Sequence, residues 1–187
     1  CNGSYIYGRN NRRMICHCGG GKRNLISAIA KSCNSYFADV YRRSIEKYPS
    51  ASKGMDVWSN HLKSFGLGNF LGYDLPIGKR GLIPDGDYYD RRYPDFRWGA
   101  TTTLSNAIGQ GEILSTPIQM ANWTAAIANK GFFFKPHLLK PNDNYEIDED
   151  YVKPINTSIE PQYFEPIIEG MSEVFTSGTA SFLNVPG

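Results

Sequence analysis

Apolar residues recur at three- and four-residue steps between residues 24 and 47, and this helical period constrains the fold more than any other feature of the chain. They are Leu25, Ile26, Ile29, Cys33, Phe37, Val40 and Tyr41. The polar stretch KSCNS interrupts the period in its middle, and Ser and Asn favour turns because their side chains compete for backbone groups. The sequence therefore predicts two consecutive helices, about 24–31 and 35–47, joined by a turn that carries Ser32 and Asn34. Either the turn only reverses the chain, or its polar side chains face something that needs them.

The rest of the pattern predicts a mixed chain that is richer in helices than in strands. Helices are expected at Met55–Phe65, 117–130 and 161–175, a strand at 131–140, and a long surface loop at 84–103. The clearest of these helices follows Ser115 or Thr116 as the N-cap, has Pro117 in its first turn and ends at Gly131. It is apolar on most sides, so we expect it to be largely buried.

Charge and hydropathy exclude several classes of protein. The 187 residues are 41% hydrophobic and 20% charged, which is typical of a globular protein. The net charge is +2 and the basic residues are scattered apart from GRNNRR at 8–13, so nucleic-acid binding is not expected. No apolar run approaches the roughly 18–20 residues of a membrane span, and no signal peptide is visible. The chain begins at Cys1 without a Met, so we expect it to be an internal fragment of a longer protein.

The four cysteines all lie in the first 33 residues, spaced C-x14-C-x-C-x14-C. They are Cys1, Cys16, Cys18 and Cys33. Four thiolates can bind one tetrahedral Zn²⁺, with His17 as an alternate ligand. Cys16 and Cys18 are too close in sequence to bond each other easily, so two crossed disulfides are the second possibility, and four unpaired thiols the third. The spacing alone leaves all three open.

The segment TSGTA, residues 176–180, looks like the Lys-Ser/Thr-Gly strand motif of penicillin-recognising enzymes but lacks its cation. Thr176 stands in the place of the Lys that would bind a carboxylate. The segment also follows a predicted helix directly. We therefore expect Gly178 to end that helix rather than to line a substrate site.

Several stretches together resemble the transpeptidase domain of class B penicillin-binding proteins, in particular the penicillin-binding protein 2 branch of the cell-elongation system. They are NLISAIAKSCNSYFADVY, FGLGNFLGYDLP and AIGQGEILSTPIQMANWTAAIANKGFFFKPHLL, in the order of that family. The resemblance covers residues 1–187 and implies one α+β transpeptidase domain of the penicillin-recognising fold, of which this chain is mainly the helical part.

The resemblance also implies an acyl-serine mechanism that depends on three motifs. Only the middle one, Ser-x-Asn, is present, as Ser32-Cys33-Asn34. SAIAK at 27–31 spaces Ser and Lys one residue too far apart to be the Ser-x-x-Lys motif of the nucleophile. Family order places Ser-x-x-Lys before Cys1 and Lys-Ser/Thr-Gly just after FLNVPG at 182–187, so the fragment by itself is expected to be inactive.

In that mechanism a serine attacks the D-Ala-D-Ala end of a peptidoglycan stem peptide, and an amine of a neighbouring stem accepts the acyl group. The resemblance implies that Ser32 relays a proton, that the Asn34 side chain binds the substrate amide, and that β-lactams acylate the same serine as the substrate. Catalysis needs no cofactor. A catalytically inactive β-lactam sensor or scaffold of the same fold is the alternative, as is an unrelated small zinc-stabilised binding module.

Members of this branch can carry a structural zinc behind the Ser-x-Asn turn, with mixed carboxylate, His and Cys ligands. The resemblance therefore places Cys33 at such a site, where Cys1, Cys16 and Cys18 could be its partners. It further implies that the parent protein is anchored in the cytoplasmic membrane with this domain on the periplasmic or outer side. There it is expected to pair with a membrane glycan polymerase of the elongation machinery that maintains cell shape.

Overall fold

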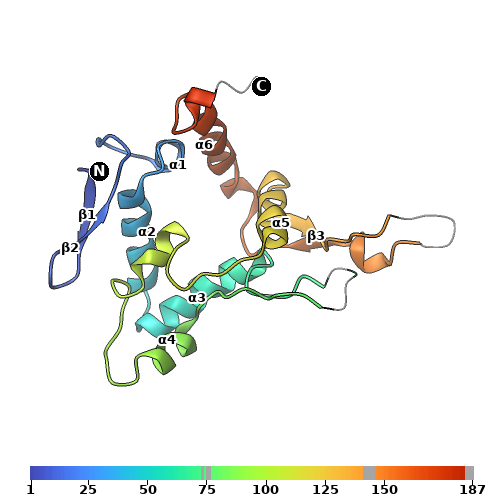
Figure 1. Cartoon of the computed structure of the whole chain (residues 1–187), viewed down its shortest axis with the longest axis horizontal. Helices are drawn as coiled ribbons and strands as arrows, with labels where there is room; N and C mark the ends of the chain where they lie inside the picture. The colour runs from blue at the N-terminus through green and yellow to red at the C-terminus, as the bar shows by residue number, and fades with distance from the viewer. Residues whose placement is uncertain (73, 75–76, 141–145, 184–187) are drawn as a thin grey trace. The chain divides into compact units, whose positions relative to one another are not determined.

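The computed structural model describes residues 1–72, 74, 77–140 and 146–183, and the chain folds into two compact units (Figure 1). The first unit is Cys1–Trp58, Pro84–Gly111 and Glu165–Gly187, and the second is Ser59–Ile83 and Glu112–Phe164. The described residues form helices and two small antiparallel sheets, which confirms the α+β class. None of the helices in these ranges has the length and hydropathy that a bilayer crossing requires.

The first unit combines a β-hairpin with a group of helices. Its elements are β1 (Ser4–Tyr7), β2 (Arg12–Ile15), α1 (Leu25–Ala30), α2 (Asn34–Glu46), the start of α3 (Ala51–Ser64), α4 (Gly86–Arg92), the 3-10 helix η1 (Leu104–Ile108), α6 (Glu165–Thr176) and the 3-10 helix η4 (Ser181–Leu183). The two helices predicted on either side of the polar stretch are confirmed as α1 and α2. Asn34 opens α2 instead of lying in the turn before it.

The core of this unit forms around one face of α2. Ala38, Tyr41 and Ile45 recur at helical spacing and are buried together with residues of α3, α4 and η1. The hydroxyl groups of Tyr41 and Thr103 lie 2.7 Å apart, so the buried Tyr41 oxygen has a partner. Burial of this apolar face holds α2 in place.

The segment 84–103 was predicted to be a surface loop, and this is wrong for most of its length. Asp85 caps α4, and Tyr89 on that helix is 1% exposed. Trp98 is buried too, and its indole nitrogen donates to the Asp90 carboxylate at 2.7 Å. The Pro, Gly and Asp residues of the segment suggested a loop, but its aromatic side chains supply much of the core, which local pattern does not reveal.

Helix α6 packs directly against α1, and two glycines permit the close approach (Figure 1). A β-carbon at Gly170 would lie 3.0 Å from Cβ of Ile29. Beyond the end of α6, the amide of Thr179 donates to the carbonyl oxygen of Ala30 at 3.0 Å. Gly178 does lie just past the helix, as predicted, but its φ is not positive. It is required there because a β-carbon would overlap the Ala30 carbonyl oxygen.

The second unit contains α5 (Pro117–Ala128), a short sheet and irregular segments. The sheet pairs β3 (Phe132–Phe134) with β4 (Pro154–Asn156), and two 3-10 helices, η2 (Glu149–Tyr151) and η3 (Pro161–Tyr163), flank β4 in sequence. The strand predicted at 131–140 is therefore much shorter. Buried Phe65 and Phe164 pack with ring centroids 6.1 Å apart and form part of this unit's core.

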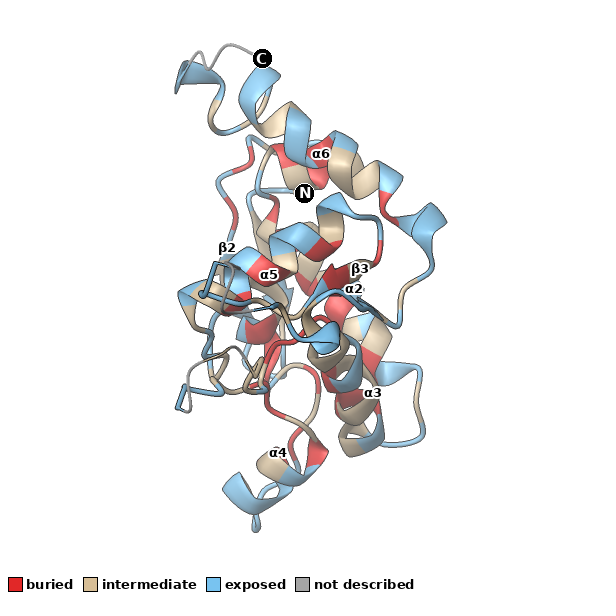
Figure 2. Ribbon diagram, turned by 90° about the vertical axis from the view of Figure 1, so that its right-hand side faces the viewer, coloured by how far each residue is buried: buried red, intermediate tan, exposed pale blue. Residues whose placement is uncertain are grey.

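Helix α5 was predicted to be largely buried, and this is wrong within this chain (Figure 2). Two of its three buried residues are polar, because Gln119 and Asn122 donate to backbone carbonyls of a glycine-rich segment. Gln119 donates to Asn69 and Arg80 at 2.8 Å each, and Asn122 to Phe65 at 3.0 Å. These amide side chains thus supply hydrogen bonds to carbonyl groups that strand pairing would otherwise satisfy. The apolar Met120, in contrast, is 41% exposed.

We predict that Gly178→Ala destabilises the protein by about 2 kcal/mol, because the new methyl group would displace the Ala30 carbonyl from the Thr179 amide. Gly99→Ala is the matched control. A β-carbon at Gly99 meets nothing within 4 Å and its φ is not positive. Urea unfolding of both variants measures the difference, and equal stabilities would contradict the packing described.

The carboxylate of Asp74 accepts the backbone amides of Leu138 and Leu139 at 2.8 Å each. The hydrogen bond from Leu139, with that from Leu138, lowers the pKa of Asp74 below its ordinary value. Its stabilising contribution is therefore complete above about pH 3.9, the value in an unfolded chain, and is lost as the pH falls through the lower folded pKa. NMR shifts of the two Leu amides should titrate with a midpoint below 3.9, and Asp74→Asn should abolish that titration. A midpoint at or above pH 3.9 would contradict the lowered pKa of Asp74.

Candidate active-site turn and metal centre

The chain reverses between α1 and α2 through a turn that places a serine where glycine is favoured. The amide of Ser32 donates to the Ile29 carbonyl at 3.0 Å, and that of Cys33 to the Ala28 carbonyl at 2.8 Å. These two bonds define a Schellman motif, in which the residue after the C-cap takes a left-handed conformation. That residue is Ser32, with φ of +50°. A non-glycine residue there costs about 1 kcal/mol, so the serine side chain is retained against a local preference.

The two predicted catalytic side chains differ in their surroundings. Ser32 is exposed, whereas Asn34 is half-buried and its Nδ2 donates to the Ile15 carbonyl at the end of β2 at 2.9 Å. This bond joins the start of α2 to the β-hairpin. A cavity of about 800 Å³ in the same unit is lined by other residues, among them Tyr48 and Trp98. The catalytic roles of Ser32 and Asn34 therefore stay predictions that rest on the motif and on the backbone of the turn.

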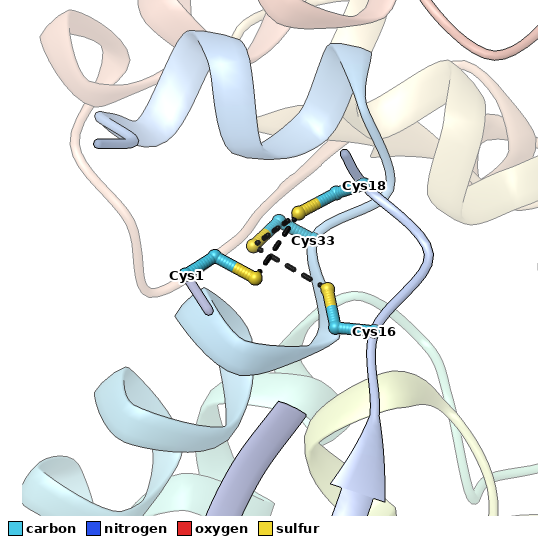
Figure 3. A group of neighbouring side chains, drawn as sticks. All are labelled: Cys1, Cys16, Cys18 and Cys33. Atoms are coloured by element: carbon cyan, nitrogen blue, oxygen red, sulfur yellow. Dashed lines mark hydrogen bonds between the residues drawn. The ribbon is translucent and has the colours of Figure 1, made fainter. Parts of the chain in front are cut away.

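The four cysteines converge on one point behind the turn (Figure 3). Their sulfur atoms all lie within 4.8 Å of one another, and hydrogen bonds join Cys18 to Cys1 at 3.2 Å, Cys18 to Cys33 at 3.4 Å and Cys16 to Cys33 at 3.7 Å. Cys1 is partly exposed and the other three are buried. His17, the alternate ligand, is exposed and does not belong to this group.

Local backbone geometry explains how residues so far apart in sequence meet. The hairpin of β1 and β2 returns the chain from Cys1 to Cys16, and three consecutive glycines at 19–21, all with positive φ, turn it back again. The amide of Gly21 donates to the Cys1 carbonyl at 2.9 Å, and the Cys1 nitrogen donates to the Gly21 carbonyl at 2.8 Å. Cys33 enters from the other direction as the N-cap residue of α2.

The distances and burial of the cluster fit a tetrahedral metal ion. With Zn–S bonds of about 2.3 Å, the sulfur atoms of a tetrahedral site lie about 3.8 Å apart, close to the separations observed here. Small rotations of the side chains would reach that geometry. The donor set of four thiolates is one that zinc prefers.

The pKa values of two of the four thiols are shifted in opposite directions. Burial raises the pKa of Cys16, but backbone amides of Ser35 and Cys18 donate to its sulfur and bring the pKa below its ordinary value. Burial also raises the pKa of Cys33, and the sulfurs of Cys18 and Cys16 raise it further. The surroundings thus favour the thiolate form of Cys16 and the neutral form of Cys33.

A second contact region holds the turn from the side of α6, and sequence reasoning missed it. The Lys31 ammonium donates to the Ser177 carbonyl, and the Thr179 amide donates to that of Ala30. The segment TSGTA therefore packs beside the Ser-x-Asn turn although it is not the Lys-Ser/Thr-Gly motif. A helix-ending glycine does not by itself reveal which backbone it packs against, so the sequence carried no signal for this contact.

Comparison with known proteins identifies the family. Residues 2–187 match the penicillin binding protein transpeptidase domain, so the chain belongs to that family. It is 30% identical over 172 residues to the peptidoglycan D,D-transpeptidase MrdA of Acinetobacter baumannii, an alignment that covers 90% of this chain and 24% of the relative. The chain thus spans about a quarter of the length of that protein.

Solved structures show the same relationship. The chain is similar to Pseudomonas aeruginosa PBP2 in complex with WCK 5153, with a TM-score of 0.78 and 28% identity over 97% of this chain and 38% of that one. It is also similar to PBP2 in the complex between PBP2 and MreC from Helicobacter pylori. There the TM-score is 0.74 and the identity 28%, over 96% of this chain and 31% of that one. The fold is therefore that of penicillin-binding protein transpeptidase domains.

Proposed function

We propose that the protein containing this chain is a peptidoglycan D,D-transpeptidase and that residues 32–34 are its Ser-x-Asn motif. The observation that carries the proposal is the left-handed Ser32, a strained serine at a helix end where glycine would cost less. Family membership supplies the reaction class, and the peptidoglycan D,D-transpeptidase of Acinetobacter baumannii is a relative. The nucleophile and its Lys then belong to a Ser-x-x-Lys motif that precedes Cys1, and the carboxylate-binding Lys-Ser/Thr-Gly strand follows Gly187.

Each side chain of the turn has a role in that reaction. The exposed hydroxyl of Ser32 passes a proton between the catalytic Lys and the leaving or attacking amine. The carboxamide of Asn34 donates to the amide carbonyl of the D-Ala-D-Ala stem peptide and helps to hold that Lys. Its bond to the Ile15 carbonyl uses one N–H of the carboxamide, which leaves the second N–H and the oxygen for these contacts. β-Lactams acylate the serine of the preceding motif as substrate mimics.

We predict that Ser32→Ala and Asn34→Ala in the full-length protein each lower the rate of acylation by a fluorescent penicillin about 100-fold. The first loses a proton relay, which contributes at least that much, and the second loses the hydrogen bonds of the carboxamide to the amide carbonyl and the catalytic Lys. Ser172→Ala, at an exposed position of α6, is the matched control and should leave the rate unchanged. Chain 1–187 alone should not be labelled.

Two results would contradict the proposal. Labelling of chain 1–187 would mean that the nucleophile lies within it, and acylation at the normal rate in both turn variants would remove their catalytic role. A full-length protein that binds the penicillin without acylation would instead be a catalytically inactive sensor or scaffold.

A structural Zn²⁺ bound by Cys1, Cys16, Cys18 and Cys33 completes the proposed site. When bound, the ion is a cross-link and takes no part in acyl transfer. Cys33 lies between Ser32 and Asn34 and is fully buried, so its bond to the metal would fix the turn from behind.

Metal analysis of the full-length protein should find one zinc per chain, and removal of the zinc by a chelator should lower the melting temperature, since binding energy at such sites is folding energy. Cys16→Ser should lower both the zinc content and the melting temperature. His17→Ala, which changes an exposed neighbour, should lower neither. Less than half an equivalent of zinc in the wild type would count against the site.

We further propose that the domain lies on the outer side of the cytoplasmic membrane, anchored by a part of the protein outside this chain. Its partner there would be a membrane glycan polymerase of the elongation machinery. Two similar structures support the partner alone, a complex of PBP2 with MreC and a peptidoglycan synthase complex that coordinates polymerisation and crosslinking. Labelling of intact spheroplasts by a penicillin that cannot cross the membrane tests the location, and a domain protected from that probe would contradict it.

A further inference from the structure

The four sulfur atoms behind the turn can be joined into two disulfides in three ways, and the distances between them favour one of the three. The distances 3.2 Å for Cys1–Cys18 and 3.7 Å for Cys16–Cys33 use each sulfur once. The competing division contains the 3.4 Å pair Cys18–Cys33 but leaves Cys1 with Cys16, between which Figure 3 shows no hydrogen bond. The third division would join Cys16 to Cys18, only two positions apart, which disulfide geometry disfavours.

We propose that this cluster is a site of reversible oxidation, at which the thiolates exchange the metal for two disulfides, Cys1–Cys18 and Cys16–Cys33. The inference rests on the proposed zinc. The oxidant is a peroxide or the disulfide of a thiol oxidoreductase, either of which takes two electrons from each pair of thiolates.

The step balances for a peroxide as follows. One thiolate attacks a peroxide oxygen, the O–O bond breaks, and a sulfenic acid and a hydroxide form. The second thiolate of the pair attacks the sulfenic sulfur, the S–S bond forms and the second hydroxide leaves. Two pairs therefore consume two peroxides and four protons and give two disulfides, four waters and a free Zn²⁺.

The separation of the sulfur atoms sets the order of the two disulfides. The sulfur atoms of Cys1 and Cys18 lie 3.2 Å apart and those of Cys16 and Cys33 lie 3.7 Å apart, so the first pair needs the smaller movement to reach bonding distance. Loss of these two ligands leaves Cys16 and Cys33 to form the second bond across 3.7 Å.

The second disulfide would keep together the two segments that the metal joins. Cys16 follows Ile15, whose carbonyl accepts the Asn34 side chain, and Cys33 precedes Asn34 in the turn. A bond between Cys16 and Cys33 thus runs beside that hydrogen bond. Each of the two disulfides spans 17 positions of the sequence, so the oxidised protein replaces one metal cross-link with two covalent ones of equal span.

The test oxidises the full-length, zinc-loaded protein with hydrogen peroxide and follows zinc with a chromogenic chelator while disulfides are mapped by mass spectrometry. Trypsin leaves Cys16 and Cys18 on one peptide, between Arg13 and Lys22, so fragmentation at His17 must assign the partners. One zinc should leave for every two disulfides, Cys1–Cys18 should form before Cys16–Cys33, and dithiothreitol with added zinc should reverse both.

Two variants separate the pairs. Cys1→Ser should still form Cys16–Cys33, and Cys16→Ser should still form Cys1–Cys18. A predominant Cys18–Cys33 bond, irreversible sulfinic acids, or zinc retained after oxidation would overturn this inference and leave the zinc site intact. A wild-type protein without zinc before oxidation would overturn the zinc site as well as the exchange, so the two failures are distinguishable.

Discussion

The left-handed backbone at Ser32 is the constraint on which the candidate site depends. It ends α1 with a Schellman motif, starts α2 two residues later and leaves the serine hydroxyl exposed at the point of reversal. A serine in this conformation is unfavourable by itself, and the surroundings compensate for it. The Asn34–Ile15 hydrogen bond joins the turn to the hairpin, and the Thr179–Ala30 bond joins the end of α1 to the segment after α6. Burial of the α2 face then fixes the direction in which the second helix leaves.

The sequence predicted the parts of this arrangement that local rules determine. Helical periodicity located α1 and α2, and the polar residues between them located the turn. The same rules located α5 and its cap, because Thr116 and Gln119 form a capping box. They did not predict the left-handed conformation of Ser32. The hydrogen bonds of the Schellman motif use backbone atoms only, so any residue that tolerates a positive φ can occupy this position.

The errors have a common physical cause, namely that burial depends on distant partners. Helix α5 has an apolar surface, yet its amide residues face inward because Gln119 satisfies the carbonyls of Asn69 and Arg80, which lie far away in sequence. Trp98 looked like a loop residue and is buried beside α4. The cysteine spacing, in contrast, left metal, disulfides and free thiols open. Only the structure shows that the four sulfur atoms lie within 4.8 Å of one another.

The most direct test of this account is hydrogen exchange at the Cys33 amide, which donates to the Ala28 carbonyl at 2.8 Å and closes the turn. If the turn is held rigidly from the hairpin and from α6, this amide in the full-length protein should be protected as strongly as that of the fully buried Ala38 in the middle of α2. Exchange at Cys33 as fast as at the exposed Arg97 would show that the reversal is loose, and the account would be contradicted.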